Sequence, residues 1–347
     1  MTNSKHLIYL FLSSLLILSC AKNETHFQSG EEKNVAILDE VQIIQIPLTG
    51  EVANRKSEIS GLCWYNHNLV LLPQFPDRFS NSDGGKIFYI SKEKIKNFFS
   101  GKDKSPILTN HYSINVNDFS DLFSVGSGFE SITINNDIAY FTIEHTSLLT
   151  TESLMISGLI DDSLKTITLD GESLTKIPSD VNINNFSCES ILFHNNQIYP
   201  IYEANGQNIN PNSKVAVFDP NIKLQKEIKF PNIEYRITDV TSVDTNNTFW
   251  AINYLFPREI GKLNPASDDI AQKFGIGKSH SESKAVERLV QFQIENDKII
   301  RTSKAPIYLE LLKNDSRNWE GIARFDDDGF LIATDMFPKT ILAFVKN

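Results

Sequence analysis

Cysteine, methionine and tryptophan are scarce in this 347-residue chain, which contains three of each. Three cysteines cannot form the disulfide framework of a small secreted domain, so Cys63 and Cys188 are expected to be unpaired core residues. Basic residues are also in the minority, because 33 Lys and Arg face 43 Asp and Glu, for a net charge of −10. A nucleic acid needs a basic protein face, so this charge balance argues against a nucleic-acid partner.

Signatures of common hydrolases and nucleotide-binding proteins are missing as well. The sequence contains no Gly-x-Ser-x-Gly elbow, no His-Glu-x-x-His pair and no Walker loop, and its seven histidines are scattered. Amphipathic helices are nearly absent, since only Lys92–Ser100 could form one short helical turn. What remains is a chain dominated by short runs of alternating polar and apolar residues, which is typical of β-strands.

One long apolar run does occur, from Leu7 to Leu18. It is shorter than the roughly 20 residues of a membrane-spanning helix and fits the central region of a signal peptide. Ile17-Leu18-Ser19-Cys20 resembles a bacterial lipobox, which implies cleavage before Cys20 and its lipidation; an ordinary signal peptide with a chance cysteine is the alternative. We therefore expect a signal peptide over 1–19, a polar tether over 20–41, and a membrane-anchored lipoprotein of the cell envelope, facing the periplasm or the exterior.

Short hairpins with a polar residue at each open end recur along the rest of the chain. The stretch Phe129–His145 predicts two alternating strands around the turn Asn135-Asn136-Asp137, with Glu130 and Glu144 at the open ends. Four further stretches follow the same pattern. The two polar positions are 14 residues apart in four hairpins and 15 apart in the last: Ser60/Gln74, Glu130/Glu144, Glu189/Glu203, Asp239/Asn253 and Glu320/Asp335.

Further strands between the hairpins would complete a four-stranded sheet in each repeat. Small antiparallel sheets at intervals of about 50 to 80 residues indicate a β-propeller. Strands at Val41–Leu48 and Lys339–Asn347 would close one blade with both ends of the chain. We predict one all-β propeller over 42–347 with five readable repeats and five or six blades, since a sixth could lie between Phe256 and Leu312; a β-sandwich with coincidental spacing is the alternative.

The polar pairs are expected to meet at one mouth of the central channel. Residues equidistant from a hairpin turn face each other, and the innermost strands of a propeller surround its axis. Seven carboxylates would then repel one another. Protonation, a Ca²⁺ ion with its six to eight oxygen ligands, or nearby bases such as Arg236 and Arg317 could relieve that repulsion, and a neutralised channel without chemistry stays open as an alternative.

Three of the hairpins resemble the phytase-like esterase family and the related propellers called SdiA-regulated. The residues that carry this resemblance are Ser60-Gly61-Leu62, Phe129-Glu130-Ser131-Ile132 with Glu144, and Asn318-Trp319-Glu320-Gly321-Ile322 with Thr334-Asp335. The resemblance covers residues 42–347 and implies an exported propeller that hydrolyses phosphate or carboxylic esters with calcium. Gln74 departs from it, because an aspartate is usual there, so one ligand or acid would be missing.

These arguments together predict a metal-assisted ester hydrolase. A bound Ca²⁺ would polarise the substrate's oxygen, Glu130 and Glu144 would serve as general base and acid, and Arg236 and Arg317 would clamp an anionic substrate. The predicted calcium ligands are Glu189, Glu203, Asp239, Asn253, Glu320 and Asp335.

Two other functions stay open, and with them the question of whether the protein is an enzyme. One is a non-catalytic lipoprotein that captures an oligosaccharide, peptide or partner protein at the mouth. The other is a calcium-dependent lactonase with Glu203, Asn253 and Asp335 as ligands. In each case we expect a monomer that binds a small molecule or oligosaccharide at the channel mouth and contacts the membrane through its lipid anchor only.

Overall fold

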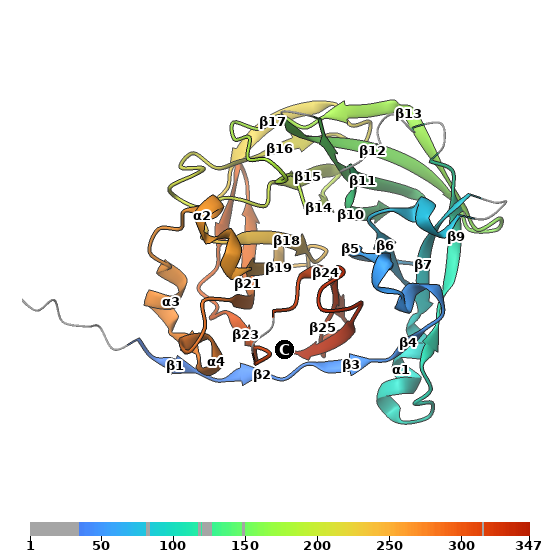
Figure 1. The fold of residues 1–347 in the computed structure, drawn as a ribbon. Helices are drawn as coiled ribbons and strands as arrows, with labels where there is room; N and C mark the ends of the chain where they lie inside the picture. Colours follow the sequence, from blue (N-terminus) through green and yellow to red (C-terminus); the bar gives the residue numbers. More distant parts are fainter. Residues whose placement is uncertain (1–34, 81–83, 117–118, 120–126, 148–149, 314–315) are drawn as a thin grey trace, which may run out of the picture. The chain divides into compact units, whose positions relative to one another are not determined.

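The strands follow from the alternation of apolar and polar residues along each repeat. The computed structural model describes residues 35–80, 84–116, 119, 127–147, 150–313 and 316–347, with Val35–Asn347 in one compact unit. Cys20 and the predicted signal peptide lie outside the described residues. Within the described ranges the strands form five four-stranded antiparallel blades (Figure 1). The predicted all-β propeller is therefore confirmed, with five blades.

The four strands of each blade follow one another in sequence from the inside outward, and in the last blade the outermost strand comes from the N-terminal end. Blade 1 contains β5 (Ile59–Tyr65), β6 (Asn68–Pro73), β7 (Gly85–Ser91) and β9 (Asn110–Ile114). Blade 2 contains β10 (Gly128–Asn135), β11 (Ile138–Thr146), β12 (Thr151–Asp161) and β13 (Thr166–Lys176). Blade 3 contains β14 (Ser190–His194), β15 (Gln197–Ile201), β16 (Lys214–Phe218) and β17 (Leu224–Lys229). Blade 4 contains β18 (Arg236–Val240), β19 (Thr248–Leu255), β21 (Val286–Glu295) and β22 (Lys298–Arg301). Blade 5 contains β24 (Trp319–Phe325), β25 (Gly329–Thr334), β26 (Leu342–Lys346) and β3 (Ile44–Ile46).

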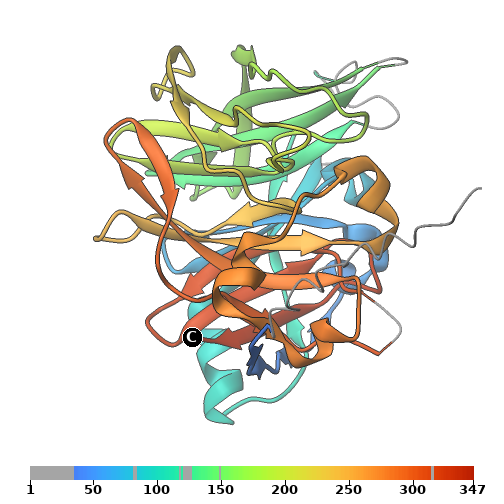
Figure 2. The same cartoon turned by 90° about the vertical axis from the view of Figure 1, so that its left-hand side faces the viewer.

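Both ends of the compact unit meet in blade 5, as the unpaired terminal strands predict. The C-terminal strand β26 pairs antiparallel with β3, with Phe344 opposite Ile44. Figure 2 shows blade 4 between blade 3 above it and blade 5 below it. No sixth blade forms in the described part of the chain, because β21 and β22 complete blade 4.

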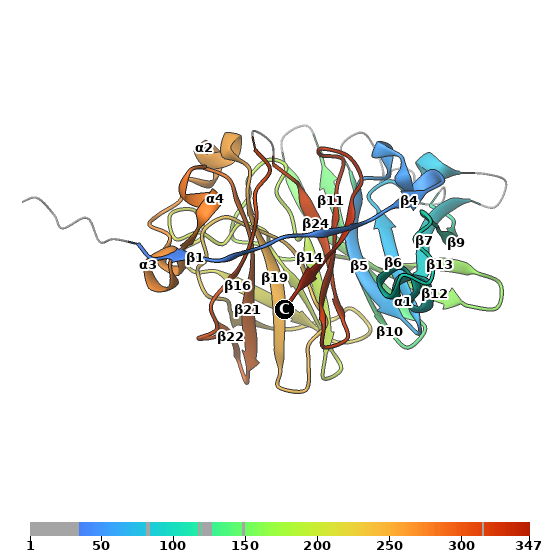
Figure 3. The ribbon, with the colours of Figure 1, turned by 90° about the horizontal axis from the view of Figure 1, so that it is seen from below.

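The segment from Ile37 to Thr49 runs across three blades, and we call it the N-terminal strap (Figure 3). Its first two strands pair with short strands beside blade 4: β1 (Ile37–Leu38) with β20 (Ile276–Gly277), and β2 (Glu40–Val41) with β23 (Ile307–Leu309). Its third strand, β3, pairs with β26 of blade 5. Its last strand, β4 (Leu48–Thr49), pairs with β8 (Ile107–Leu108), which lies in the connection between β7 and β9 of blade 1. Glu40 fixes the strap, because its Oε1 accepts hydrogen bonds from Ser279 N at 2.9 Å and from His280 Nδ1 at 2.7 Å. Part of the stretch predicted as a tether thus belongs to the compact unit.

Short helices fill two connections. α1 (Lys92–Ser100) begins at the N-cap Ser91 and ends at Gly101, which adopts the left-handed conformation that glycine favours. The stretch between β19 and β21, which reads as a polar loop in the sequence, forms α2 (Ile260–Leu263), α3 (Asp269–Phe274) and α4 (Lys278–Ser281). None of the helices within the described ranges has the length and apolarity needed to cross a membrane.

The hydrophobic core is divided into five clusters, one between each pair of neighbouring blades in the described residues. Leu62 of blade 1 packs with Leu331 of blade 5 in one of them, and Trp250 of blade 4 packs with Trp319 of blade 5 in another. Each cluster is made of side chains from two facing sheets, so every inner strand is held by packing on both sides. This packing fixes the ends of the inner strands, which carry the polar pairs.

Candidate functional site

β-Bulges place the polar residues at the start of the inner strands. The register shifts between Phe129 and Ser131 in blade 2, so Gly128 rather than Glu130 pairs with Glu144. The extra residue is Glu130, and corresponding shifts occur at Ser60, Asp239 and Glu320. The prediction that the two members of each pair face each other is therefore wrong in this blade, and also in blade 4, where Ile237 lies opposite Asn253. A bulge redirects the side chain of the extra residue, and here it turns Glu130 towards the channel.

A cavity of about 1030 Å³ opens at this end of the inner strands, and all five blades contribute to its lining. Figure 3 shows α2, which follows the second strand of blade 4, at the same end. The cavity contains more acidic than basic groups. Its carboxylates are Glu58, Glu130, Glu144, Glu189, Glu259, Glu320 and Asp335, and its cations are Arg78, Arg236 and Arg258.

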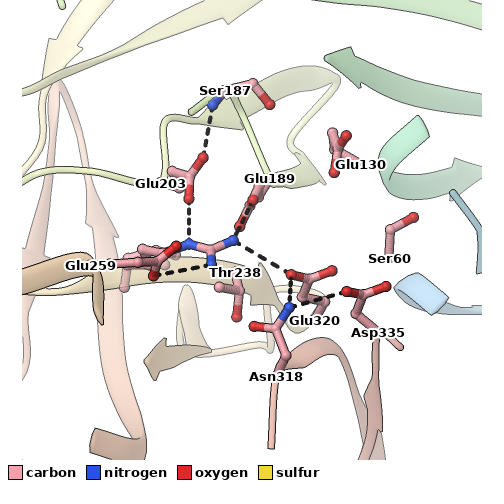
Figure 4. A network of polar contacts seen from close by, with 12 residues as sticks. Ser60, Glu130, Ser187, Glu189, Glu203, Thr238, Glu259, Asn318, Glu320 and Asp335 are labelled. Carbon is pink, nitrogen blue, oxygen red and sulfur yellow. Dashed lines mark hydrogen bonds and ion pairs between the residues drawn. The ribbon is translucent and has the colours of Figure 1, made fainter. Parts of the chain in front are cut away.

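Arg236 forms ion pairs with a cluster of carboxylates from Glu189, Glu203, Glu259 and Glu320, which Figure 4 labels. Its Nη2 donates to both oxygens of Glu189 at 2.6 and 2.8 Å, and its Nε donates to Glu203. Its guanidinium also lies 3.5 Å from Glu259 and from Glu320. Burial alone would lower the pKa of Arg236, but these carboxylates raise it well above its usual value, so the guanidinium stays charged.

The arrangement around Arg236 does not fit the predicted calcium site. The guanidinium lies where a cation would have to bind Glu189, Glu203 and Glu320 together. Among the residues that the structure describes, no group of three or more His, Cys, Asp or Glu side chains could hold a metal ion. A bound calcium ion stays a prediction that these residues do not support.

Two of the predicted ligands are engaged elsewhere. The Asp239 carboxylate accepts hydrogen bonds from Ile322 N at 2.7 Å, from Leu62 N at 3.3 Å and from Ser131 Oγ at 3.2 Å. It thereby joins blade 4 to blades 5, 1 and 2. Asn253 accepts from Arg288 Nε at 2.7 Å, and neither Asp239 nor Asn253 lines the cavity.

Arg317, predicted as a substrate clamp, is buried in a separate ion pair. Its Nε lies 2.9 Å from Glu287 Oε2, and its Nη2 donates to Glu310 O at 2.5 Å. Trp319 Nε1 donates to the same Glu287 oxygen at 2.7 Å. Arg317 does not line the cavity, so of the two predicted clamps only Arg236 reaches it.

Glu130 and Glu144 share the cavity, and the pKa of each carboxyl is raised. Burial first, and then the charges of Glu144 and Glu189, raise the pKa of Glu130 well above its usual range. Burial and Glu189 raise the pKa of Glu144 to about 7. Gln74 Nε2 donates to Glu130 Oε1 at 2.9 Å, so the residue that departs from the family pattern contacts one of the predicted catalytic acids.

Blade 5 adds a second acidic pair to the cavity. Asn318 Nδ2 donates to Glu320 at 2.6 Å and to Asp335 at 3.2 Å, which bridges the two carboxylates. Burial and the charge of Glu58 raise the pKa of Asp335 to about 6. Burial and Asp335 raise the pKa of Glu320 well above its usual range.

Sequence reasoning did not identify the aromatic part of the lining. Phe75, Phe256 and Phe337 all contact the cavity, and each directly precedes a proline in the connection after the second strand of its blade. This repeated Phe-Pro pair is the signal that could have revealed them. Glu259, which follows one of these pairs, was also not predicted.

Comparison of the sequence with protein-family models gave no match, and comparison with curated protein sequences gave none either. Several solved structures have a similar chain path at low identity. A putative glycoside hydrolase from Bacteroides ovatus is 10% identical, covers 91% of this chain and 95% of its own, and has a TM-score of 0.48. A structure described under the GH130 family of mannoside phosphorylases and glycoside hydrolases is 10% identical, with 84% of each chain covered and a TM-score of 0.48. A glucose dehydrogenase is 10% identical, covers 88% of this chain and 99% of its own, and has a TM-score of 0.46.

These similarities carry no argument about the activity of this chain. The resemblance to phytase-like esterases stays a prediction, because no family model matches.

Proposed function

We propose that this protein is a hydrolase that cleaves the glycosidic bond of an uncharged substrate by carboxyl acid–base catalysis in the cavity. The observation that carries the proposal is the pair Glu130 and Glu144. Both carboxyls line one cavity, and burial raises the pKa of each above its usual value. Carboxyls that share a cavity and have strongly raised pKa values are candidates for acid–base catalysis.

Glycosidic cleavage suits the chemistry of the lining better than ester cleavage. It requires two carboxyl groups and needs neither a nucleophilic hydroxyl or thiol nor a metal. Among the described residues, no histidine or cysteine lines the cavity. A phosphate ester would need free cations, and two of the three arginines of the cavity are already paired with carboxylates: Arg236 with four of them, and Arg78 with Glu58 at 2.5 Å.

The two carboxyls divide the chemistry by their protonation. Burial favours the protonated form of Glu130, which in that form donates its proton to the oxygen of the leaving sugar. Glu144, in its ionised form, takes a proton from the attacking water or attacks the anomeric carbon itself. The rate should therefore rise as the pH increases through about 7, because Glu144 is then converted to its ionised form.

The test is a hydrolysis screen of the purified protein against neutral oligosaccharides, aryl esters and phosphate esters, with calcium and with chelator. We expect sugar reducing ends to be released, with equal rates in chelator. Glu130→Gln and Glu144→Gln should each lower kcat by roughly 10² to 10⁴-fold, the usual contribution of a general acid or base. Glu227→Gln, an exposed acid on β17, is the control and should keep full activity.

Each alternative has its own outcome in this screen. Cleavage of esters alone, lost in chelator, would replace the proposal with the metal-assisted hydrolase or the lactonase predicted from the sequence. Retention of a glycan without cleavage would support the non-catalytic binding protein.

A further inference from the structure

Three connections at the mouth of the cavity share the dipeptide Phe-Pro. Phe75-Pro76 follows β6 in blade 1, Phe256-Pro257 follows β19 in blade 4, and Phe337-Pro338 follows β25 in blade 5. Blades 4, 5 and 1 are consecutive around the ring, since β3 and β26 close blade 5 between the other two. The three rings therefore lie along one arc of the mouth, and we call them the aromatic rim. Glu144 of blade 2 and Glu189 of blade 3 contribute to the cavity from the blades outside this arc.

The backbone fixes two of the three rings in place. Phe75 and Phe256 are the N-cap residues of the 3₁₀ helices Pro76–Phe79 and Pro257–Glu259, each with proline at its first position. Proline restricts its own φ angle and the conformation of the residue before it. Rings held in this way lose little conformational freedom when a ligand binds, so more of the contact energy remains available for affinity.

Each ring also has an arginine guanidinium over one face. The distance from the guanidinium carbon to the ring centre is 3.8 Å for Arg78 on Phe75, 5.8 Å for Arg258 on Phe256 and 4.6 Å for Arg55 on Phe337. Such stacking holds the ring, while Arg78 Nη1 pairs with Glu58 at 2.5 Å and Arg55 Nε donates to Met336 O at 2.9 Å. Phe337 nevertheless stays 50% exposed, and a large apolar ring left open beside a cavity marks a binding surface.

We propose that the aromatic rim stacks against the sugar rings of an uncharged oligosaccharide, so that the substrate is a chain of several sugar units. The C–H face of a sugar ring is apolar and flat, and it matches the face of an aromatic side chain. The sugar hydroxyls would meet the remaining N–H groups of these arginines, which can donate to a neutral hydroxyl oxygen as well as to a carboxylate. The chain length of the substrate rests on the proposed function, whereas binding to the rim can be measured without any cleavage.

Affinity electrophoresis in native gels that contain neutral polysaccharides tests the binding directly. The probes are soluble glucans, mannans, arabinans and xylans, with pectate as an acidic comparison. Wild type should be retarded by at least one neutral polysaccharide. Phe75→Ala, Phe256→Ala and Phe337→Ala should each weaken this retardation about tenfold, because each removes the burial of one aromatic side chain.

Leu159→Ala is the matched control, because Leu159 is 60% exposed on β12 and does not line the cavity. Its retardation should equal that of wild type. Unfolding curves of all variants show whether a variant that binds more weakly is still folded. Phe337→Ala is the most informative variant, because its ring is the most exposed. Retardation by pectate alone, no retardation by any neutral polysaccharide, or equal retardation of the three rim variants and wild type would each overturn the proposal.

The same gels separate this inference from the proposed hydrolase. Glu144→Gln should be retarded as strongly as wild type while losing cleavage, since it leaves the rim intact. If the rim variants lose binding but no bond is cleaved by wild type, the rim is correct and the hydrolase is wrong. If cleavage occurs and kcat/KM does not increase from disaccharide to pentasaccharide, the proposed hydrolase activity is supported and the binding of an oligosaccharide by the aromatic rim is contradicted.

Discussion

Arg236 is the residue on which the charge balance of the cavity depends. Its side chain is 9% exposed, and the four carboxylates around it are held by one guanidinium. The sequence predicts Arg236 as a base near the carboxylates of the mouth, but only the structure shows that its partners come from blades 3 and 5 as well. A guanidinium can bind several carboxylates at once because its five donors point in fixed directions.

Replacing this arginine should therefore destabilise the fold more than replacing a surface arginine. Arg236→Gln leaves Glu189 and Glu203 buried without a counter-charge, which costs about 3–5 kcal/mol for a broken buried pair. The comparison is Arg301→Gln, whose partner Asp269 is exposed and whose loss should cost less than about 1 kcal/mol. Urea unfolding of both variants measures the difference. Equal stability of the two variants would show that the cluster is balanced by protonation instead.

Glu144 should make the stability of the protein depend on pH. Its pKa is about 7 in the folded protein and 4.5 for the unperturbed group, so the folded state binds its proton more tightly. This tighter proton binding adds to the free energy of unfolding. The added stability is fully present below about pH 4.5 and is lost as the pH rises through about 7. Glu144→Gln cannot ionise, so it should melt close to wild type at pH 5 and several degrees above wild type at pH 8.

The control for this measurement is Glu227→Gln, which should melt with wild type at both values. A Glu144→Gln variant that is less stable than wild type at pH 8 would contradict the assigned direction of the shift.

At the scale of the elements, periodicity predicted most of what the structure contains. The alternation of residues and the repeated spacing identified all five inner hairpins and the closing pair of terminal strands. The bulges were not predicted, although Glu130 and Ser131 place two polar residues in succession where strict alternation would have one. The helices between β19 and β21 were also missed, since α3 has six residues and depends on its N-cap Asp268 and on tertiary packing.

The N-terminal strap is the element whose loss should weaken the ring most. A chain that begins at Leu48 lacks β1, β2 and β3, and it leaves the edge of β26 unpaired. Compared with a chain that begins at Val35, it should melt at a lower temperature and self-associate, because an open strand edge pairs with other chains. A peptide of residues 35–47 added in excess should restore the melting temperature. Unchanged melting without the strap would contradict its role in closure.

At the scale of the whole molecule, the site is a product of five separate repeats. Spacing alone predicted that Glu130, Glu144, Glu189, Glu320 and Asp335 would lie at one mouth, and they do line one cavity. The spacing could not predict that the Asp239 side chain points away from the cavity and joins neighbouring blades, because its partners Leu62 and Ile322 are distant in the sequence. The ion pairs of Arg236 and the positions of the aromatic rim likewise depend on contacts between residues that are distant in the sequence.

Attachment of the molecule to a membrane is a separate prediction of the sequence, since Cys20 lies outside the described residues. Cys20→Ser should release the protein from the membrane fraction, because the thiol that would carry the lipid is gone. Fractionation of cells that produce both forms measures this, with the retained signal peptide as an independent readout by mass. An unchanged distribution would contradict the lipid anchor.

The closure of blade 5 also sets the order in which the chain can complete its fold. Ile44 pairs with Phe344, so the ring stays open until β26 has been synthesised. Contacts across about 300 residues form late, because a long loop must close before they contribute any energy. A newly made chain would therefore remain an open, incompletely folded ring until β26 emerges. The export that the predicted signal peptide implies requires such an incompletely folded chain.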